Sequence, residues 1–218
     1  MSIKMLFFFS LLSLKVFGQS TAANDSLIAV MCKTLAANKA TVDTEKIKLV
    51  VTQHLNPYLQ QFDNTKAEEI SDAIFIRAQR QCKDFADLIF RLTPKQSDWQ
   101  MVDKKPVSRM EKKNCIEFLK IKKYFYLEAN GDTVNLSIEN GLWTDHFKDS
   151  TFSTLKFRQL NNCEFEIEFI SSNNSMRQKL SNPGDKYRYQ ILEKLEGSYL
   201  MSAEIVGGNQ FMTFKIYY

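Results

Sequence analysis

The chain is poor in the residue types on which most catalytic and metal sites depend. It has only two histidines, His54 and His146, and no G-x-S-x-G, H-E-x-x-H, P-loop, EF-hand or Rossmann glycine pattern. Its four cysteines lack C-x-x-C spacing and a nearby pair of histidines, which argues against a zinc site. The sequence therefore predicts no catalytic residue, no metal site and no cofactor.

The chain also lacks a strong excess of charge of one sign. It has 29 lysines and arginines against 25 acidic residues, and loss of the leader described below leaves 27 − 25 = +2. Proteins that bind nucleic acid usually show a strongly basic face or stripe, so we expect no nucleic-acid partner. Beyond the leader, no apolar stretch approaches the roughly 20 residues of a membrane-spanning helix, so none is predicted there.

The first 18 residues have the pattern of a cleavable secretory signal peptide. Lys4 supplies a positive start, and Met5–Leu14 is a run of 10 residues that are all apolar except Ser10 and Ser13. Val16-Phe17-Gly18 then places small residues at the positions required for a cut before Gln19. No cysteine follows that cut directly, which argues against a lipid anchor, because the first cysteine is Cys32. We therefore expect a secreted protein, either periplasmic or extracellular.

Apolar residues recur at helical spacing through the first part of the mature chain, which predicts a helical domain over residues 24–93. We expect Asn24 or Asp25 to cap a first helix and Asp43 to cap a second. Pro57 should kink or end the second helix.

A third helix is predicted from the capping-box spacing of Thr65 and Glu68. Its apolar stripe runs without interruption from Ile70 to Leu92, and Pro94 should stop it. Residues 94–114 are polar and without a period, which predicts a linker; its Trp99 should dock on one of the two flanking bodies.

From Cys115 onward the apolar period changes to two, which is typical of strands with one buried face. Asn-Gly and Gly-Gly pairs between the alternating runs are hairpin signals. The predicted strands are Cys115–Leu127, Thr133–Glu139, Leu142–Lys148, Phe152–Leu160, Cys163–Ile170, Tyr187–Leu195, Tyr199–Val206 and Phe211–Tyr218, with a long polar loop over Ser171–Lys186.

The predicted fold is therefore α+β, with a small helical bundle followed by an eight-stranded antiparallel meander over residues 115–218. Such a meander usually curls to remove its open edges, so we expect a closed or nearly closed up-and-down barrel. A β-sandwich is the alternative.

Four cysteines in an exported chain predict two disulfide bonds. Three pairings are possible, and spacing alone does not choose among them. The division into a helical and a strand-rich part favours Cys32–Cys82 and Cys115–Cys163. Each would close a loop of about 50 residues, worth roughly 4 kcal/mol in the chain-entropy description.

Two short segments around the second cysteine pair resemble a known family. They are Asn114-Cys115-Ile116-Glu117-Phe118 and Leu160-Asn161-Asn162-Cys163-Glu164-Phe165. They resemble the signatures of a family of small exported, lipocalin-like β-proteins of Gram-negative bacteria, over residues 112–218. The resemblance implies a fold and an exported address but no catalytic residue. At Gln159 a polar amide replaces the family's usual tryptophan, and Ile121 or Lys122 stands in place of a usual glycine.

Two groups of polar residues were weighed as catalytic candidates. Asp145 and His146 are neighbours on a predicted strand, so their side chains should point to opposite faces. Glu164, Glu166 and Glu168 share one face and alternate with apolar residues, which is typical of a solvated wall. Neither pattern predicts an active site.

The apolar face of the predicted barrel is unusually aromatic. An eight-stranded barrel is either filled by its own side chains, which so many rings favour, or leaves room for one small molecule. Buried tyrosine hydroxyls need hydrogen-bond partners, so several that converge would form a pocket with polar tips. The candidate ligand-binding residues are Tyr124, Tyr126, Phe157, Gln159, Phe165, Tyr187, Tyr189 and Tyr199.

These observations favour an exported binding or envelope-interaction protein without enzymatic activity. Its β-domain would hold a small apolar ligand, or the protein would contact another envelope protein. The alternative is an envelope hydrolase that uses carboxylates such as Glu164 and Asp145.

Overall fold

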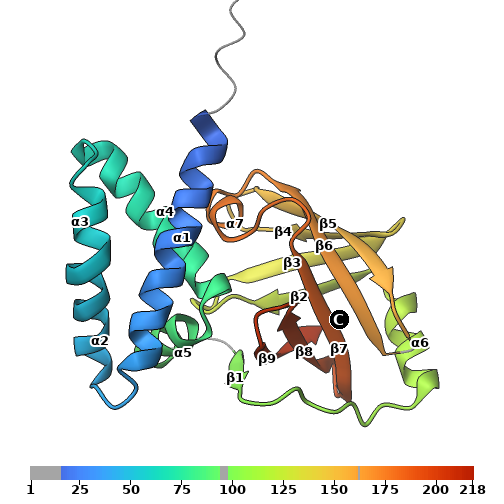
Figure 1. Cartoon of the computed structure of the whole chain (residues 1–218). Helices are drawn as coiled ribbons and strands as arrows, with labels where there is room; N and C mark the ends of the chain where they lie inside the picture. Colours follow the sequence, from blue (N-terminus) through green and yellow to red (C-terminus); the bar gives the residue numbers. More distant parts are fainter. Residues whose placement is uncertain (1–15, 94–97, 162) are drawn as a thin grey trace, which may run out of the picture.

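The computed structural model describes residues 16–93, 98–161 and 163–218. Helices α1 to α5 pack on one side of a rolled-up antiparallel sheet (Figure 1). Most of the expected signal peptide, residues 1–15, and the first part of the expected linker, residues 94–97, lie outside the described residues.

The helical part has one small apolar core beside the sheet. Its elements are α1 (Val16–Ala37), α2 (Asp43–Val50), a π-helical turn (Val51–Leu55), α3 (Asn56–Leu59), α4 (Asn64–Gln81) and α5 (Lys83–Leu92). Ile28, Val50, Ile74 and Leu88 are almost fully buried in it. Pro57 does not end the helix: the backbone stays helical through the π-helical turn into α3, which has this proline in its first turn.

The predicted cap of the first helix is wrong. Helix α1 begins at Val16, and both cap candidates lie inside it. Their side chains bind other helices instead: Asn24 accepts a hydrogen bond from the Tyr58 hydroxyl at 3.0 Å, and Asp25 accepts one from Gln81 at 2.8 Å. Tertiary contacts therefore account for these two polar residues.

The predicted cap of the second helix is also wrong. The N-cap of α2 is Val42, which has no capping side chain. Asp43 lies in the first turn and pairs with Arg91 of α5, with Nε and Oδ2 at 2.8 Å. This carboxylate therefore ties two helices together.

The third predicted helix starts earlier than expected and is divided in two. Asp63, instead of Thr65, caps α4, because its carboxylate accepts a hydrogen bond from the Lys66 amide at 3.0 Å. The stripe is interrupted at Cys82, whose backbone is extended where the Cys32–Cys82 disulfide joins it to α1. Helix α5 starts directly after this residue.

The sheet is a closed, all-antiparallel barrel of eight strands with one extra strand, consistent with the predicted lipocalin-like fold. Its strands are β1 (Gln100–Val102), β2 (Lys123–Leu127), β3 (Thr133–Glu139), β4 (Leu142–His146), β5 (Phe152–Gln159), β6 (Glu164–Ser172), β7 (Lys186–Leu195), β8 (Ser198–Ile205) and β9 (Gln210–Tyr217). Their order is β1-β9-β2-β3-β4-β5-β6-β7-β8, and pairing of β8 with β9 closes the barrel. The sandwich alternative is therefore wrong.

Two further helices replace segments predicted as strand and loop. Helix α6 (Lys112–Lys120) occupies the start of the predicted first strand, since Cys115 and Phe118, three residues apart, are both fully buried on one helical face. Helix α7 (Ser175–Leu180) lies in the predicted polar loop, and Asn174 caps it by accepting a hydrogen bond from the Arg177 amide. In Figure 1, α6 and α7 lie at opposite sides of the barrel.

The expected linker is part of the barrel. Strand β2 pairs with β9 only at Phe125 and Tyr217 among the described residues, and β1 pairs with Phe211, Met212 and Thr213 on the same β9 edge. Next to β1, the Trp99 ring stacks on Phe214 at 4.1 Å, and its Nε1 donates a hydrogen bond to the Leu127 carbonyl at 2.7 Å. The predicted docking of this tryptophan is confirmed.

We expect replacement of Trp99 by alanine to lower the free energy of unfolding by about 3 kcal/mol. Removal of this packed aromatic ring leaves a cavity where β1 and β2 meet β9. Urea unfolding monitored by circular dichroism would measure it. Trp99→Phe, which keeps an aromatic ring, should lose less than Trp99→Ala, and equal losses would contradict a packing role.

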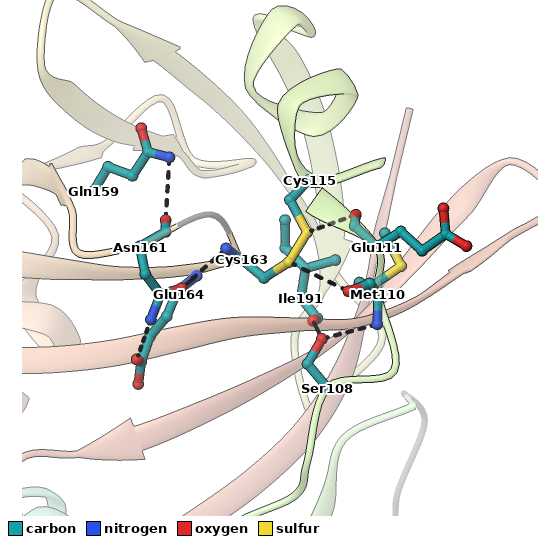
Figure 2. The surroundings of a disulfide bond; sticks show 9 residues. All are labelled: Ser108, Met110, Glu111, Cys115, Gln159, Asn161, Cys163, Glu164 and Ile191. Carbon is teal, nitrogen blue, oxygen red and sulfur yellow. Dashed lines mark hydrogen bonds between the residues drawn. A yellow bond between two sulfur atoms is a disulfide. The ribbon is translucent and has the colours of Figure 1, made fainter. Parts of the chain in front are cut away.

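Both predicted disulfides are present, and all four cysteines are used. The second joins Cys115 of α6 to Cys163, the residue just before β6 (Figure 2). The segment before α6 is held on the barrel by Ser108, whose hydroxyl donates to the Ile191 carbonyl at 2.6 Å. Two disulfides indicate an oxidising, extracytoplasmic location.

Candidate functional site

One end of the barrel interior is filled by α6. Phe118 enters it with no exposed surface, and its ring centroid lies 4.7 Å from that of Tyr124 and 5.2 Å from that of Tyr199. The Tyr124 hydroxyl donates to the Phe118 carbonyl at 2.5 Å, so the polar tip of this tyrosine is satisfied within the protein. The disulfide holds α6 in this position.

Seven of the eight predicted ligand-binding residues belong to the packed interior. Tyr124, Tyr126, Phe165 and Tyr199 are buried there, and Phe157, Tyr187 and Tyr189 are partly buried against the same cluster. Gln159 is exposed, and its amide donates to the Asn161 carbonyl at 3.1 Å (Figure 2). The structure therefore brings most of these side chains together as filling for the barrel, and Gln159 does not join them.

A buried carboxylate lies among the aromatic rings. Asp145 is on the inward face of β4, where it is 7% exposed, and Trp143 Nε1 donates to its Oδ1 at 2.9 Å. Tyr126, on the neighbouring part of the sheet, also favours the charged form of Asp145 and so lowers its pKa. Burial raises the pKa of Asp145 to about 6, against the positive charge of Arg177 and the hydrogen bond from Trp143, which lower it.

Arg177 comes to this region from α7, an element that the sequence analysis missed. Its guanidinium pairs with Glu128, which follows β2, and lies 5.1 Å from the ring centroid of Phe147. Burial opposes its charge, but the negative charges of Glu128 and Asp145 act in the other direction and the pKa of Arg177 is raised. The signal for α7 was the capping residue Asn174 ahead of it.

A cleft of about 760 Å³ opens where the helical part meets the barrel. Five segments line it: α4, the turn after β2, the start of β3, the turn after β4, and α7 with its cap. The apolar lining residues are Ile76, Ala129, Val134, Phe147, Met176 and Leu180, and the charged ones are Glu128, Asp132, Lys148, Asp149 and Arg177. None of the eight predicted ligand-binding residues lines it. The sequence analysis missed this cleft because its walls are distant in the chain.

The wall supplied by α4 is fixed to the barrel through one carboxylate. Asp185, just before β7, pairs through Oδ2 with Arg77 Nη1 at 2.8 Å and with Arg80 Nε at 3.0 Å. The Arg80 guanidinium also lies 4.6 Å from the ring centroid of Tyr187, and its carbonyl accepts a hydrogen bond from Gln210 at 2.9 Å. All these contacts bury the arginines of α4 at the junction.

The carboxylates weighed for hydrolysis do not form a pair. Asp145 faces the interior of the barrel, whereas Glu164 lies on the outer wall with Lys105 at 3.0 Å. Glu166 is likewise paired on the outer wall, with Arg158 at 2.9 Å. His146 is exposed beside the buried Asp145, so these neighbours point to opposite faces as predicted.

Comparison of the chain with protein-family models, curated proteins and solved structures found no match. Within the described ranges, no helix has the length and apolar character needed to cross a membrane. The same part of the chain contains no group of three or more His, Cys, Asp or Glu residues placed to hold a metal ion.

Proposed function

We propose that this chain is an exported, non-enzymatic binding protein whose site is the cleft between α4, α7 and the hairpin turns of the barrel. The observation that carries the proposal is a cleft of about 760 Å³, a size typical of small-molecule sites, beside a barrel whose interior is occupied by its own rings. The proposed site lies outside the barrel interior, where the sequence analysis expected a ligand. The two disulfides support an exported address.

The lining favours a small amphipathic ligand. Ile76, Phe147 and Leu180 offer an apolar surface from three separate segments. Lys148 and Arg177 contribute positive charge to the same lining, and Glu128, Asp132 and Asp149 contribute negative charge. A ligand with an apolar body and a polar head would satisfy both kinds of surface, as small-molecule sites commonly do.

Membership of the exported lipocalin-like family belongs to the same proposal. It is supported by the closed antiparallel barrel and by the disulfide between Cys115 and Cys163, the cysteines of the two signature segments. The expected signal peptide over residues 1–18 gives the export route.

Probe binding tests the proposed site. The amphipathic anion 1-anilinonaphthalene-8-sulfonate should bind the folded protein, and Ala129→Trp should weaken binding about tenfold or more, because the new ring fills the cleft from an exposed position. Ala36→Trp, on an exposed part of α1, is the matched control and should bind like the unaltered protein.

Two outcomes would contradict the proposed site: no binding of this anion or of a cationic amphipathic dye, or equal binding by both tryptophan variants. Native mass spectrometry of protein purified from the cell envelope would then seek the natural ligand. A bound mass that disappears in Ala129→Trp is the result we expect.

A further inference from the structure

We infer that α7 is a pH-sensitive lid of the cleft. The negative charge of Asp145 helps to hold Arg177, and with it α7, against the barrel, and protonation of Asp145 loosens the helix. The role of lid rests on the proposed function of the cleft. The motion of α7 can be measured without any ligand, so the two ideas can fail separately.

Helix α7 is attached to the barrel mainly by polar contacts. Ser175, Met176 and Gln178 are exposed, and the other three side chains of the helix, Arg177 among them, are only partly buried. Arg177 pairs with Glu128, and Asn174 at the cap donates to the Thr151 hydroxyl at 2.8 Å. A helix held in this way responds to a change of charge beneath it more than a helix anchored by an apolar face, whose burial is independent of pH.

The same helix forms one wall of the cleft and contacts the α4 wall. Met176, Arg177 and Leu180 line the cleft. On the other side, the Leu180 carbonyl accepts a hydrogen bond from Arg77 at 3.0 Å, and Lys179 lies 3.5 Å from Asp72. Displacement of α7 would therefore change the width of the cleft directly.

The charged and titratable groups that face Asp145 come from three other elements. Tyr126 and Glu128 belong to β2 and the turn after it, Tyr189 belongs to β7, and Arg177 belongs to α7. Glu128 and Asp145 both attract Arg177. When Asp145 is protonated, Arg177 keeps the attraction of Glu128 and loses that of Asp145.

The change falls just below neutral pH, because burial raises the pKa of Asp145 to about 6. Its effect on α7 is opposite to its effect on the whole fold. Protonation removes a buried charge and so favours the folded barrel, while it weakens the attraction that holds α7. A lid is thus distinguishable from general loosening of the protein.

Hydrogen exchange of the full mature chain, read by mass spectrometry and corrected for intrinsic rates, tests the inference. Amides of residues 175–181 should lose several-fold of their protection at about pH 5 relative to about pH 7.5, while global stability does not fall. Asp145→Asn should show the low protection at both pH values, because an amide carries no charge.

Two control variants should keep the pH step of the unaltered protein. Asp43→Asn removes a carboxylate that pairs with Arg91 in the helical part, far from α7 in the chain. His146→Gln removes an exposed imidazole that is the neighbour of Asp145 in the chain.

Absence of a pH step in α7, or a step that persists in Asp145→Asn, would overturn the lid. A step that depends on Asp145 in a protein that binds neither amphipathic probe would leave the motion established and refute the cleft as a ligand site. Probe binding without any step would do the reverse.

Discussion

Asp185→Ala is expected to lower the free energy of unfolding by about 4 kcal/mol, because it leaves buried arginines without their shared carboxylate. The Arg77 and Arg80 side chains are only 13% and 8% exposed. Arg80 Nη1 already lacks a hydrogen-bond partner within the described ranges, so the remaining contacts do not replace the lost one. Asp185 also accepts a hydrogen bond from the Asn182 amide at 2.8 Å, which fixes the loop before β7.

Urea unfolding followed by circular dichroism would measure this loss. Asp72→Ala is the matched control, since Asp72 is 63% exposed and lies 3.5 Å from Lys179, and an exposed pair of this kind is worth less than about 1 kcal/mol. If the two variants were equally stable, Asp185 would not be the attachment of α4 to the barrel. If Asp185→Ala unfolded in two steps, with the first at a lower urea concentration, the helical part would have become independent of the barrel.

Asp145→Asn is expected to stabilise the protein by about 3 kcal/mol above about pH 7, since burial raises the pKa of Asp145 from 3.8 to about 6 and each unit corresponds to about 1.4 kcal/mol. Below about pH 3 the carboxyl is protonated in both folded and unfolded chains, and the advantage should vanish. As the pH rises through 6, the unaltered protein must hold a buried charge, and asparagine avoids it. The amide oxygen can still accept the hydrogen bond from Trp143.

The free energy of unfolding of Asp145→Asn and of the unaltered protein, measured across this pH range, would show whether the difference between them appears as the pH rises. Asp43→Asn should change stability in the opposite direction at neutral pH, because the hydrogen bond from Arg91 lowers the pKa of Asp43 to about 2. Its stabilising effect is present above the ordinary carboxyl pKa and is lost only as the pH falls toward 2. A pH-independent effect of Asp145→Asn would contradict a buried charge at this position.

The sequence predicted the elements whose pattern is local and missed those that depend on distant partners. Thr133–Glu139 was predicted with its observed bounds, since alternation and an Asn-Gly turn define that strand within a few residues. Cys115 to Leu127 was predicted as one strand because a short apolar run does not distinguish helix from strand. Only the fit of Phe118 into the barrel shows that its first half is helical.

The candidate site was less predictable than the fold for the same reason. Alternation identified which rings face inward, such as Phe165 and Tyr199, but gave no measure of the space left between them. The cleft is assembled from Ile76, Val134 and Met176, which are far apart in the sequence and share no local pattern. Likewise, a buried Asp145 beneath Arg177 requires knowledge of the tertiary structure.

The seam between β2 and β9 has a consequence for where the β-domain begins. Asp98 accepts a hydrogen bond from the Tyr217 hydroxyl at 2.7 Å, and β1 pairs with the first half of β9. A polypeptide cut at Cys115, the boundary that composition indicates, would therefore leave half of the β9 edge bare and open to pairing with another chain. The shortest β-unit that keeps this edge paired therefore starts at Asp98. The strand that covers the edge, β1, comes from the segment that follows the helical part.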